Sequence, residues 1–545
     1  MKPSIDLKWQ GYRYFPYEKR LALREVKMLL GAKPKSTKTG LRLTLGSLPP
    51  NVLERLTYFR EIRLNGTAQS IPFQARLEAS ALTKQSRYRT QAPSQDEMPV
   101  LTRQSTRYSA HGLHEYRGKF NPQIVRAIGN LLQLPHDAWV LDPFCGSGTC
   151  LLECAHVGWN AVGIDLNPLG VFISNAKLEA MRVDTTVLAA HVQRLVNRLN
   201  SKVRGLDLNK PLSALGYTRL RAAEEARLPN RAYLEGWFAV SVLAQLECIE
   251  GEIRRLESSH VRSIVQVVLS DCLRIVSWQD PGDLRIRRRK DPRQNYPLVP
   301  LFTTALAQRT AAIIRARAVI GRVRGVHRAV LGDSRQGLPN TAPRPHGRMA
   351  LFDCIITSPP YATALPYIDT QRLSLAFLGL VQEEGIRCLE RSLIGNREIS
   401  FHERDVDEGQ IDKAAGLLPQ EVLAICRLTR RLVLNSNDGF RRQNVPALLF
   451  RYFRDMSQMF ASTLPLVRPG GSFALVVGPN RTTLAGREIQ IETPRLLAMV
   501  AQHVGWHLTE IFPLDAYQRF DLHQKNSIRK EALVILRRPR KDGRQ

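Results

Sequence analysis

WVLDPFCGSGT, at residues 139–149, begins the pattern on which the fold prediction depends; LLECAHVG at 151–158 and NAVGIDLNP at 160–168 follow it. The apolar residues before Asp142 predict a buried strand, and the glycines of DPFCGSGT predict a tight turn. LLECAHVG then predicts a helix, and the apolar run that ends at Asp165 predicts a second strand. A strand, a helix and a strand in this order form a β-α-β unit, which requires a parallel sheet.

Further strand-like segments appear only after a long gap. They are VHRAVLGDSR (326–335), FDCIITSPPY (352–361), SFALVVGPN (472–480) and EALVILRR (531–538). Between about 167 and 325 the pattern is mostly helical, with amphipathic runs such as LAAHVQRLVNRL at 188–199. We therefore expect an α/β fold with a doubly wound, Rossmann-like sheet at 101–545. Residues 167–325 would form a helical insertion, a possible target-recognition region.

The first hundred residues form a separate, basic segment in this interpretation. The run YEKRLALREVKMLLGAK at 17–33 has apolar residues at a three-to-four spacing, which predicts a helix that stops at Gly31. The stretch at 80–99 is polar and poor in large aliphatic side chains, as is typical of a linker. We therefore expect a basic accessory region at 1–100, ahead of the main domain.

The net charge indicates a polyanionic partner. The 545 residues include 79 Lys plus Arg against 49 Asp plus Glu, which gives a formal net charge of +30. Each contact between such cations and phosphate releases condensed counterions, so an excess of positive charge favours nucleic-acid binding. The alternative explanation is an arginine-rich genome that makes many of its proteins basic.

Composition and motifs also disfavour several protein classes. Hydrophobic residues make up 43% and charged residues 23%, as in ordinary globular proteins. Charges interrupt every apolar stretch before the roughly 18 residues that a membrane span requires, and MKPSIDLKWQ has no signal-peptide core. The eight cysteines form no CxxC pair. We therefore expect no metal site, no disulfide framework, no membrane partner and a cytoplasmic protein.

The segment DPFCGSGT, Asp142 to Thr149, is the first candidate site. Gly146 and Gly148 let the backbone turn sharply and let a ligand approach the chain closely. No Walker lysine is present, and an acidic residue, Asp165, ends the next strand about twenty residues later. A carboxylate at that place accepts hydrogen bonds from both hydroxyls of a ribose. The alternative is an ordinary tight turn followed by a solvated aspartate.

The segment TSPPY, Thr357 to Tyr361, is the second candidate site and follows the apolar strand FDCII. Two consecutive prolines restrict the backbone and lack N–H donors, so the carbonyls of Ser358 and Pro359 can face a ligand amino group. Tyr361 supplies a ring that can stack on a base taken out of its helix. The alternative is a proline-rich strand exit with a core tyrosine.

Together the two segments resemble those of a known family, the class I S-adenosylmethionine-dependent DNA amino-methyltransferases, which act at cytosine N4 or adenine N6. DPFCGSGT looks like the cofactor loop of that family and TSPPY like its catalytic motif. The resemblance covers about residues 105–540, with weaker matches at HGLHEYRGKFNPQ (111–123), GDSR (332–335) and RPGGSFALVVGPN (468–480). It implies S-adenosyl-L-methionine as cofactor and direct methyl transfer without a covalent enzyme intermediate.

The resemblance assigns a role to each matched residue. The catalytic motif would hold the target base through Ser358, Pro359, Pro360 and Tyr361. The cofactor would be held by Phe120, Asn121, Pro122, Asp142, Pro143, Phe144, Cys145, Gly146, Ser147, Gly148, Thr149, Asp165 and Asp333. Of these, Asp333 corresponds to the acidic residue beside the adenine ring. Because no catalytic cysteine is needed, Cys145 and Cys354 are expected to be structural thiols.

The leading function is site-specific methylation of DNA at cytosine N4, with double-stranded DNA and a possible restriction-modification partner. Serine in place of the aspartate more common in adenine-N6 enzymes favours cytosine, although many cytosine-N4 enzymes place SPPY ahead of the glycine loop. Adenine-N6 methylation therefore stays open. Base methylation of structured RNA also stays open, because LALREVKMLLG (21–31) is faintly similar to accessory domains of RNA-modifying methyltransferases. An inactive nucleic-acid-binding relative is the remaining alternative.

A basic run in the helical insertion is the candidate nucleic-acid contact. DLRIRRRKDPR, at 283–293, is too charged for a protein core. Its basic residues are Arg285, Arg287, Arg288, Arg289, Lys290 and Arg293. The alternative is a solvated surface. His111 and His114 are weaker candidates for contact with nucleic acid or cofactor, and a solvated loop explains them equally well.

Overall fold

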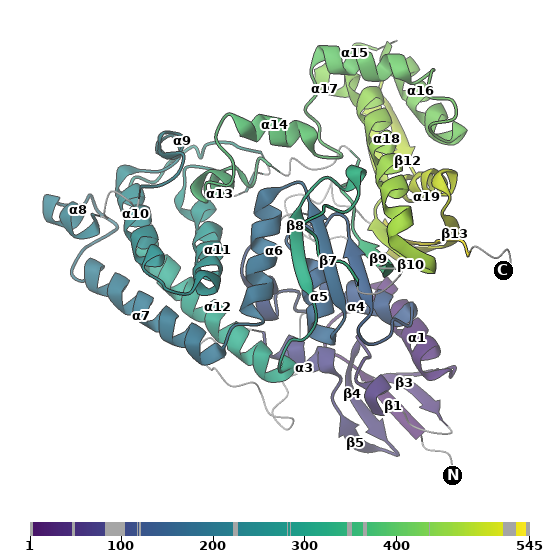
Figure 1. Cartoon of the computed structure of the whole chain (residues 1–545), viewed down its shortest axis with the longest axis horizontal. Helices are drawn as coiled ribbons and strands as arrows, with labels where there is room; N and C mark the ends of the chain where they lie inside the picture. The colour runs from purple at the N-terminus through teal and green to yellow at the C-terminus, as the bar shows by residue number, and fades with distance from the viewer. Residues whose placement is uncertain are drawn as a thin grey trace.

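The structure of the protein is a computed structural model, and its centre is a seven-stranded sheet with helices on both faces (Figure 1). The described residues are 4–45, 50–81, 104–116, 118, 121–221, 227–280, 282–283, 285–345, 351–362, 368–434, 436–515 and 530–540. Among them, no helix is both long and apolar enough to cross a membrane.

The central sheet confirms the predicted fold class. Its strand order is β13-β14-β10-β9-β6-β7-β8, and β14 is antiparallel to both of its neighbours while the other strands share one direction. The strands are β6 (Trp139–Asp142), β7 (Asn160–Asp165), β8 (His327–Leu331), β9 (Phe352–Thr357), β10 (Val467–Val477), β13 (His507–Asp515) and β14 (Lys530–Arg537). This is a doubly wound α/β sheet with one reversed strand near its edge.

The chain builds the sheet from its centre outward in two directions. From β6 it passes to β7 and β8, and it then returns to β9 on the other side of β6. The strand order therefore reverses between β6 and β9, which lie side by side. In open α/β sheets, the crevice outside the carboxyl ends of the strands at such a reversal is where ligands bind. Because β6 ends at Asp142 and β9 at Thr357, both predicted motifs begin at this point.

Alternate residues of the central strands pack on opposite faces of the sheet. Val140 and Ile356 belong to the core beneath α4 and α5, whereas Leu141 and Ile355 belong to the core beneath α18 and α19. This alternation follows from the two-residue period of a strand, and it explains why both strands are apolar throughout. The helices are α4 (Pro122–Leu131), α5 (Thr149–Val157), α18 (Val445–Thr463) and α19 (Thr493–Val504).

A helical block lies between β7 and β8, where the sequence predicts an insertion. After α6 (Pro168–Ala180), which packs against β8, the chain forms a group of helices (Figure 1, blue to teal). Their core, which includes Val265, Leu269 and Phe302, is shared with apolar side chains of α6. The helices are α7 (Thr185–Val203), α8 (Ala214–Leu220), α9 (Arg231–Glu235), α10 (Val240–Arg254), α11 (Ser259–Val276) and α12 (Leu298–Ile320).

A second helical block separates β9 from β10, and the sequence interpretation passes over it. It contains α13 (Arg372–Phe377), α14 (Gly385–Ser392), α15 (Phe401–Gln410), α16 (Gln420–Leu434) and α17 (Phe440–Gln443). From this block, shown in green in Figure 1, α18 runs down to the sheet. An antiparallel hairpin of β11 (Asn480–Leu484) and β12 (Arg487–Ile491) follows β10.

The N-terminal region forms a five-stranded antiparallel sheet in the order β2-β3-β1-β4-β5 (Figure 1, purple). Its elements are β1 (Ser4–Trp9), α1 (Pro16–Leu30), β2 (Lys35–Thr37), β3 (Gly40–Thr44), α2 (Pro50–Leu53), β4 (Phe59–Leu64), β5 (Thr67–Ser70) and α3 (Phe73–Ala79). Helix α1 ends at the expected position, since Gly31 has φ 61° and donates its N–H to the carbonyl of Lys27. Residues 82–99 of the expected linker lie outside the described residues.

Helix α1 attaches this N-terminal region to the main sheet. Arg24 forms a two-pronged ion pair with Glu510 of β13, at 2.8 and 2.7 Å. On the same helix, the buried carboxylate of Glu25 accepts a hydrogen bond from Asn130 of α4 at 2.8 Å. Apolar side chains of α1 and α4, among them Leu21 and Ile128, share one core with the main sheet. The N-terminal region is therefore packed against the central fold through a continuous apolar interface.

Candidate active site

The two predicted motifs line one cavity at the carboxyl ends of β6, β7, β8 and β9. The empty space inside it, including its opening to solvent, is about 990 Å³. The lining residues are Tyr116, Gly118, Pro143, Phe144, Cys145, Gly146, Ser147, Thr149, Asp165, Leu166, Asn167, Gly332, Asp333, Ser334, Ser358, Pro359, Pro360, Tyr361, Leu393 and Ile394. The glycine turn, Asp165, Asp333 and the four residues of the predicted catalytic motif thus surround the same space.

The glycine turn is held closely against α6. Gly146 and Gly148 have φ 47° and 76°, in the left-handed region that L side chains rarely adopt. A Cβ atom on Gly148 would lie 2.7 Å from Oγ of Ser174, so this contact requires glycine. Ser174 donates to the carbonyl of Gly146 at 2.7 Å, and the buried Lys177 donates to the carbonyl of Ser147 at 2.9 Å. Two side chains of α6 therefore fix the backbone of the turn.

Asp165 lies at the cavity wall, where two backbone N–H groups orient its carboxylate. Gly146 donates to Oδ2 at 2.7 Å, and Asn167 donates to Oδ1 at 2.8 Å. Burial raises the pKa of Asp165 to about 6, although both hydrogen bonds act in the opposite direction. An ionised carboxylate oxygen can accept about two hydrogen bonds, so each oxygen retains capacity for a ligand hydroxyl. The predicted ribose-binding role is compatible with this geometry.

A direct hydrogen bond joins the two motifs. Thr357, at the end of β9, donates from Oγ1 to Oδ1 of Asp142 at 2.6 Å, and the N–H of Phe144 donates to the same oxygen at 3.1 Å. Burial raises the pKa of Asp142 to about 7, and the nearby charge of Asp165 adds to the increase. Asp142 is fully buried and is not among the described residues that line the cavity. In this structure it orients the glycine turn through Phe144, while the predicted direct contact with the cofactor stays a prediction.

The predicted catalytic motif is supported by two residues that lie far along the chain. Tyr452 of α18 donates to the carbonyl of Pro360 at 3.0 Å. Tyr361 donates from its hydroxyl to Oε1 of Glu531, on β14, at 2.5 Å. Burial raises the pKa of Glu531, and the hydrogen bond from Tyr361 opposes that increase. The ring of Tyr361 is thus anchored at its hydroxyl end while it forms part of the cavity wall.

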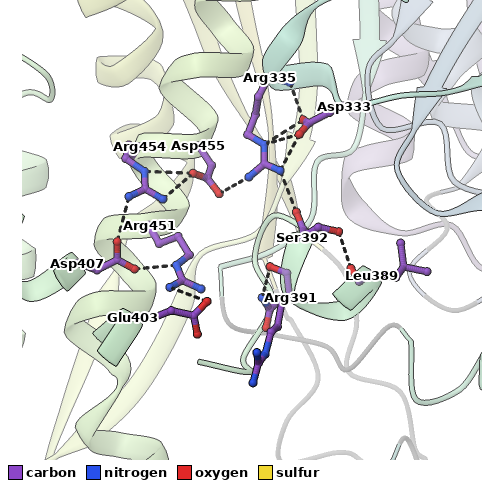
Figure 2. Close-up of polar contacts among 11 residues, drawn as sticks. Asp333, Arg335, Leu389, Arg391, Ser392, Glu403, Asp407, Arg451, Arg454 and Asp455 are labelled. Atoms are coloured by element: carbon purple, nitrogen blue, oxygen red, sulfur yellow. Dashed lines mark hydrogen bonds and ion pairs between the residues drawn. The ribbon is translucent and has the colours of Figure 1, made fainter. Parts of the chain in front are cut away.

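Asp333 also lies at the cavity wall, and one arginine occupies both of its carboxylate oxygens (Figure 2). Arg335 donates to Oδ1 at 2.9 Å and to Oδ2 at 2.7 Å. The same guanidinium donates to Asp455 of α18 at 2.9 Å and to the carbonyl of Ser392, the last residue of α14, at 3.0 Å. Arg335 therefore connects the residue predicted to lie beside the adenine ring with the second helical block.

Comparison with known proteins agrees with this arrangement. A family model described as an RMKL-like methyltransferase domain matches residues 113–227, which contain the glycine turn, Asp165 and α6. The type II methyltransferase M.AvaI of Nostoc sp. is 22% identical over 421 residues, which cover 73% of this chain and 80% of the relative. These matches identify this protein as a methyltransferase.

Two further relatives match shorter parts of the methyltransferase. The type II methyltransferase M.MjaII of Methanocaldococcus jannaschii is 21% identical over 237 residues, covering 34% of this chain and 43% of the relative. A tRNA (guanine(10)-N2)-dimethyltransferase of Methanothermobacter thermautotrophicus is 28% identical over 121 residues, covering 22% of this chain and 34% of the relative. The methyltransferase thus spans less than half the length of either of these two proteins.

The segment before α4 contributes different residues from those predicted. Phe120 lies outside the described residues. Asn121 caps α4 by accepting a hydrogen bond from the N–H of Gln123 at 2.9 Å, and Pro122 is the first residue of that helix. Helix starts favour this pair, because Asn is a good N-cap and Pro tolerates the first turn. Tyr116 and Gly118 line the cavity where the sequence predicts Asn121 and Pro122.

Two residues of the arginine run make contacts within the methyltransferase itself. Arg288 donates to the carbonyl of Gly236 at 2.6 Å and lies over the ring of Trp237 at 5.4 Å. Arg289 donates to the carbonyl of Ile275 at 2.7 Å, near the end of α11. These guanidinium groups satisfy backbone carbonyls, so their charge serves the packing of the first helical block.

The other members of the run are more available to a partner. Arg287 pairs with Asp283 at 3.1 Å and is well exposed, and Lys290 and Arg293 are exposed as well. Arg285 lines a second cavity, separate from the one described above. Contact of these side chains with phosphates stays a prediction.

His111, Glu153 and His156 form the group of metal-ligating residue types that lies together in the described part of the chain. Glu153 contacts His111 at 2.8 Å, His156 at 3.1 Å and Arg126 at 2.8 Å. Burial raises the pKa of Glu153, but Arg126 and the histidines outweigh it and hold that pKa well below its usual value. Because a guanidinium already occupies the carboxylate, we interpret the group as a buried ion-pair network. The solvated-loop alternative for His111 and His114 is wrong, since both are buried.

The thiols of Cys145 and Cys354 are buried, and burial raises the pKa of each well above its usual value. The thiolate is the nucleophilic form of cysteine. Neither residue is therefore activated for covalent catalysis in this structure, as the structural-thiol interpretation expects.

Eight lining residues were not predicted: Tyr116, Gly118, Leu166, Asn167, Gly332, Ser334, Leu393 and Ile394. Six of them lie within or beside the quoted matches around Asp165, Asp333 and HGLHEYRGKFNPQ, so wider windows around those matches would have included them. Leu393 and Ile394 come from the second helical block and carry no sequence signal. Gly148, although predicted, shapes the turn without lining the cavity.

Proposed function

We propose that this methyltransferase transfers a methyl group from S-adenosylmethionine to an exocyclic amino nitrogen in double-stranded DNA, with cytosine N4 as the leading target. The observation that carries the proposal is the single cavity shared by the glycine turn, Asp165 and the TSPPY motif. Alignment with M.AvaI and M.MjaII, both named type II methyltransferases, supports an enzyme of this kind. The net charge of +30 favours a polyanionic substrate.

The cavity residues suit this cofactor. Asp165 retains acceptor capacity for the two hydroxyls of a ribose, and the left-handed backbone at Gly146 leaves that wall without a side chain. When bound, the cofactor supplies a sulfonium methyl group whose carbon–sulfur bond breaks as the carbon–nitrogen bond forms. The hydrogen bond between Thr357 and Asp142 fixes the distance between the wall that holds the cofactor and the wall that holds the base.

The TSPPY motif would position the acceptor. The carbonyls of Ser358 and Pro359 accept hydrogen bonds from the amino group, which directs the nitrogen lone pair along the transfer path. Developing positive charge on that nitrogen is stabilised by the same two carbonyl dipoles. Tyr361 stacks on the face of the base, and the bond to Glu531 limits rotation of its ring.

A second candidate function is base methylation of structured RNA. The similarity to a tRNA (guanine(10)-N2)-dimethyltransferase favours this alternative. Adenine-N6 methylation of DNA and an inactive nucleic-acid-binding relative complete the alternatives. The intact glycine turn, Asp165 and TSPPY weigh against an inactive protein.

Transfer of radioactive methyl groups decides among these functions. The protein is incubated with tritiated S-adenosylmethionine and duplex DNA or folded RNA, and the polymer is digested and its nucleosides are identified by mass spectrometry. We expect N4-methylcytosine in the DNA. N6-methyladenine in the DNA would show that the target is adenine N6 and not cytosine N4. Label in RNA alone would overturn the assignment of DNA as the substrate. Cofactor binding by calorimetry without transfer to either polymer would identify an inactive relative.

Pro359→Ala tests the role of the motif itself. Greater backbone freedom should slow methyl transfer in single-turnover measurements while cofactor affinity stays at the wild-type value, since the glycine turn is untouched. Wild-type transfer in this variant would remove TSPPY from the amino-group site.

A further inference from the structure

A second cavity, which we call the groove, adjoins the cofactor cavity. Its volume is about 1430 Å³, and the two cavities share Leu393. The groove is walled by residues 396–399 between α14 and α15, by residues 440–445 around α17, by residues 480–482 of β11, and by Arg285 of the first helical block. It therefore lies where both helical blocks and the hairpin approach the site.

The wall between the groove and the catalytic motif is short and fixed. A Cβ atom on Gly395 would lie 2.7 Å from the carbonyl oxygen of Tyr361, so this part of the chain packs directly on the motif. Arg335 binds the carbonyl of Ser392 and thereby holds the start of the same segment (Figure 2). A ligand in the groove would consequently lie next to whatever occupies the TSPPY site.

The charges in the groove favour an extended anion. Five arginines line it, against three acidic residues. The arginines are Arg285, Arg397, Arg441, Arg442 and Arg481, of which Arg442 also pairs with Asp438 at 3.1 Å. Two of the acids, Asp369 and Glu390, are already paired with Arg372 at 3.1 and 2.8 Å. Cations spread over several elements suit a chain of phosphates better than they suit a single small anion.

An exposed aromatic pair adjoins these arginines. Phe440, which lines the groove, is 44% exposed, and its neighbour Phe401 is 62% exposed, with ring centroids 4.9 Å apart. Large aromatic side chains that are exposed next to one another often mark a surface that binds a ligand or another macromolecule. Next to phosphate-binding cations, such rings offer a stacking surface for bases.

Asn444 supplies an independent observation that a ligand enters the groove. Its side chain lines the groove and is only 2% exposed, yet its Oδ1 has no hydrogen-bond partner among the described residues. Although Asn444 precedes α18, its side chain does not cap that helix. A buried acceptor without a partner is unfavourable, and buried polar groups are rarely left so. An exocyclic amino group of a base is a donor of the kind that this oxygen requires.

We propose that the groove binds the DNA strand that flanks the target base, with the arginines on its phosphates and Asn444 on the edge of a neighbouring base. This inference rests on the proposed function and adds to it the place where sequence is recognised. It assigns recognition to the second helical block and the β11–β12 hairpin, in place of the insertion at 167–325, which contributes Arg285 to the groove. Phe440 would stack on a base of the bound strand.

The phosphate contacts are tested by salt dependence of binding. Fluorescein-labelled duplex DNA of mixed sequence is titrated with wild type and with the double variant Arg441→Gln/Arg442→Gln at several salt concentrations. If both side chains bind phosphate, the slope of log affinity against log salt should shrink by roughly 1.8. The matched control is Arg322→Gln/Arg324→Gln, two exposed arginines between α12 and β8, which should leave the slope unchanged. A wild-type slope in the groove variant overturns the proposal.

Asn444→Leu separates recognition from a structural role. Removal of an unpaired buried acceptor should leave the melting temperature unchanged or higher, whereas loss of a structural hydrogen bond would lower it. Methylated positions mapped on plasmid DNA should lose discrimination at one base beside the target. Unchanged sites at wild-type rate, or a lower melting temperature with unchanged sites, would overturn the role of Asn444.

These outcomes are distinguishable from failure of the proposed function. If wild type methylates DNA but the groove variants bind and methylate it normally, only the groove assignment fails. If the groove variants weaken binding of folded RNA but not of duplex DNA, the groove binds a different polymer and the proposal for DNA is overturned. If wild type transfers no methyl group to any nucleic acid, the proposed function itself fails.

Discussion

The glycine turn and the TSPPY motif, which face each other across one cavity, are held in place by different kinds of support. The turn is held by Asp165 at the end of β7 and by Ser174 and Lys177 of α6, which lie 19 to 30 residues further along the chain than the groups they contact. The motif is fixed by Tyr452 and Glu531, which lie 92 and 170 residues further along the chain. The wall formed by the glycine turn and Asp165, which would hold the cofactor and which we call the cofactor wall, takes its support from nearby residues, although Asp333 is linked to the second helical block through Arg335. The wall formed by TSPPY, which would hold the base and which we call the base wall, depends on correct docking of α18 and β14. Mutations should therefore separate cofactor binding from methyl transfer.

Asp165→Ala should have the largest effect, and only on the cofactor wall. Loss of two hydrogen bonds between a carboxylate and ribose hydroxyls should weaken cofactor binding by about 2–4 kcal/mol. Isothermal titration calorimetry measures this directly, and circular dichroism checks that the fold is retained. Unchanged affinity would show that Asp165 does not bind the cofactor. It would also remove the evidence that one wall binds the cofactor and the other binds the base.

Tyr361→Ala should affect the base wall alone. Loss of the ring should weaken capture of the target base by about 1–3 kcal/mol, with cofactor affinity unchanged. Tyr361→Phe is the matched control, because it keeps the stacking surface and loses the hydroxyl that bonds to Glu531. The concentration of DNA that gives half-maximal single-turnover transfer distinguishes the two variants. A cofactor-binding defect in Tyr361→Ala would contradict the independence of the walls.

Lower pH should weaken binding of the cofactor before it weakens binding of the target base. Asp165 accepts ribose hydroxyls best as a carboxylate, and its pKa is raised to about 6, so protonation below that pH removes acceptor strength. Between pH 7 and pH 5 the ionised fraction falls about tenfold, and the dissociation constant should rise by a similar factor. Asp165→Asn should flatten this profile. Because Asp142 titrates nearby, with a pKa of about 7, the same profile in Asp142→Asn shows which carboxyl is responsible.

Neutralising the arginine run should give the smallest effect. Arg288 and Arg289 each donate to a backbone carbonyl, whereas the exposed Arg287 pairs with the side chain of Asp283 and can exchange it for a phosphate. Arg287→Gln should reduce the salt slope of DNA binding by at most about 0.9, and neither wall of the cavity should respond. A reduction near three times that value in the triple Gln variant would show that Arg288 and Arg289 leave their carbonyls to bind phosphate.

The sequence predicted those parts of the site whose signal is local. Strand, turn and helix follow one another within 139–168, so the fold class and the cavity residues from Pro143 to Asp165 could be inferred from a short window. The signal for Asn121 and Pro122 was also local, but cofactor contact and helix capping favour similar residues at that place. Tyr116 and Gly118 of the same segment line the cavity, while cofactor contact by Asn121 and Pro122 stays a prediction.

Other parts of the site depend on tertiary contacts that no window contains. Leu393 and Ile394 reach the cavity because α14 docks beside Arg335, which is distant in sequence. A count of charges likewise does not distinguish an arginine that is available to bind phosphate from one that already binds a backbone carbonyl of its own chain, as Arg289 does. In both cases the sequence does not show which residue a side chain contacts, because that contact forms only when the chain is folded.

The shared core between α1 and α4 limits how far the methyltransferase can be shortened. Leu21 and Val26 of α1 cover apolar side chains of α4 such as Ile124 and Ile128. A truncated protein that starts at residue 104 would retain every cavity residue, yet it would present this uncovered surface to water and should aggregate when overproduced. Supplying residues 1–81 as a separate polypeptide should restore a monodisperse protein, since the missing surface would be returned. The shortest protein that stays soluble and active should therefore include the N-terminal region, although no described residue of that region lines the cavity.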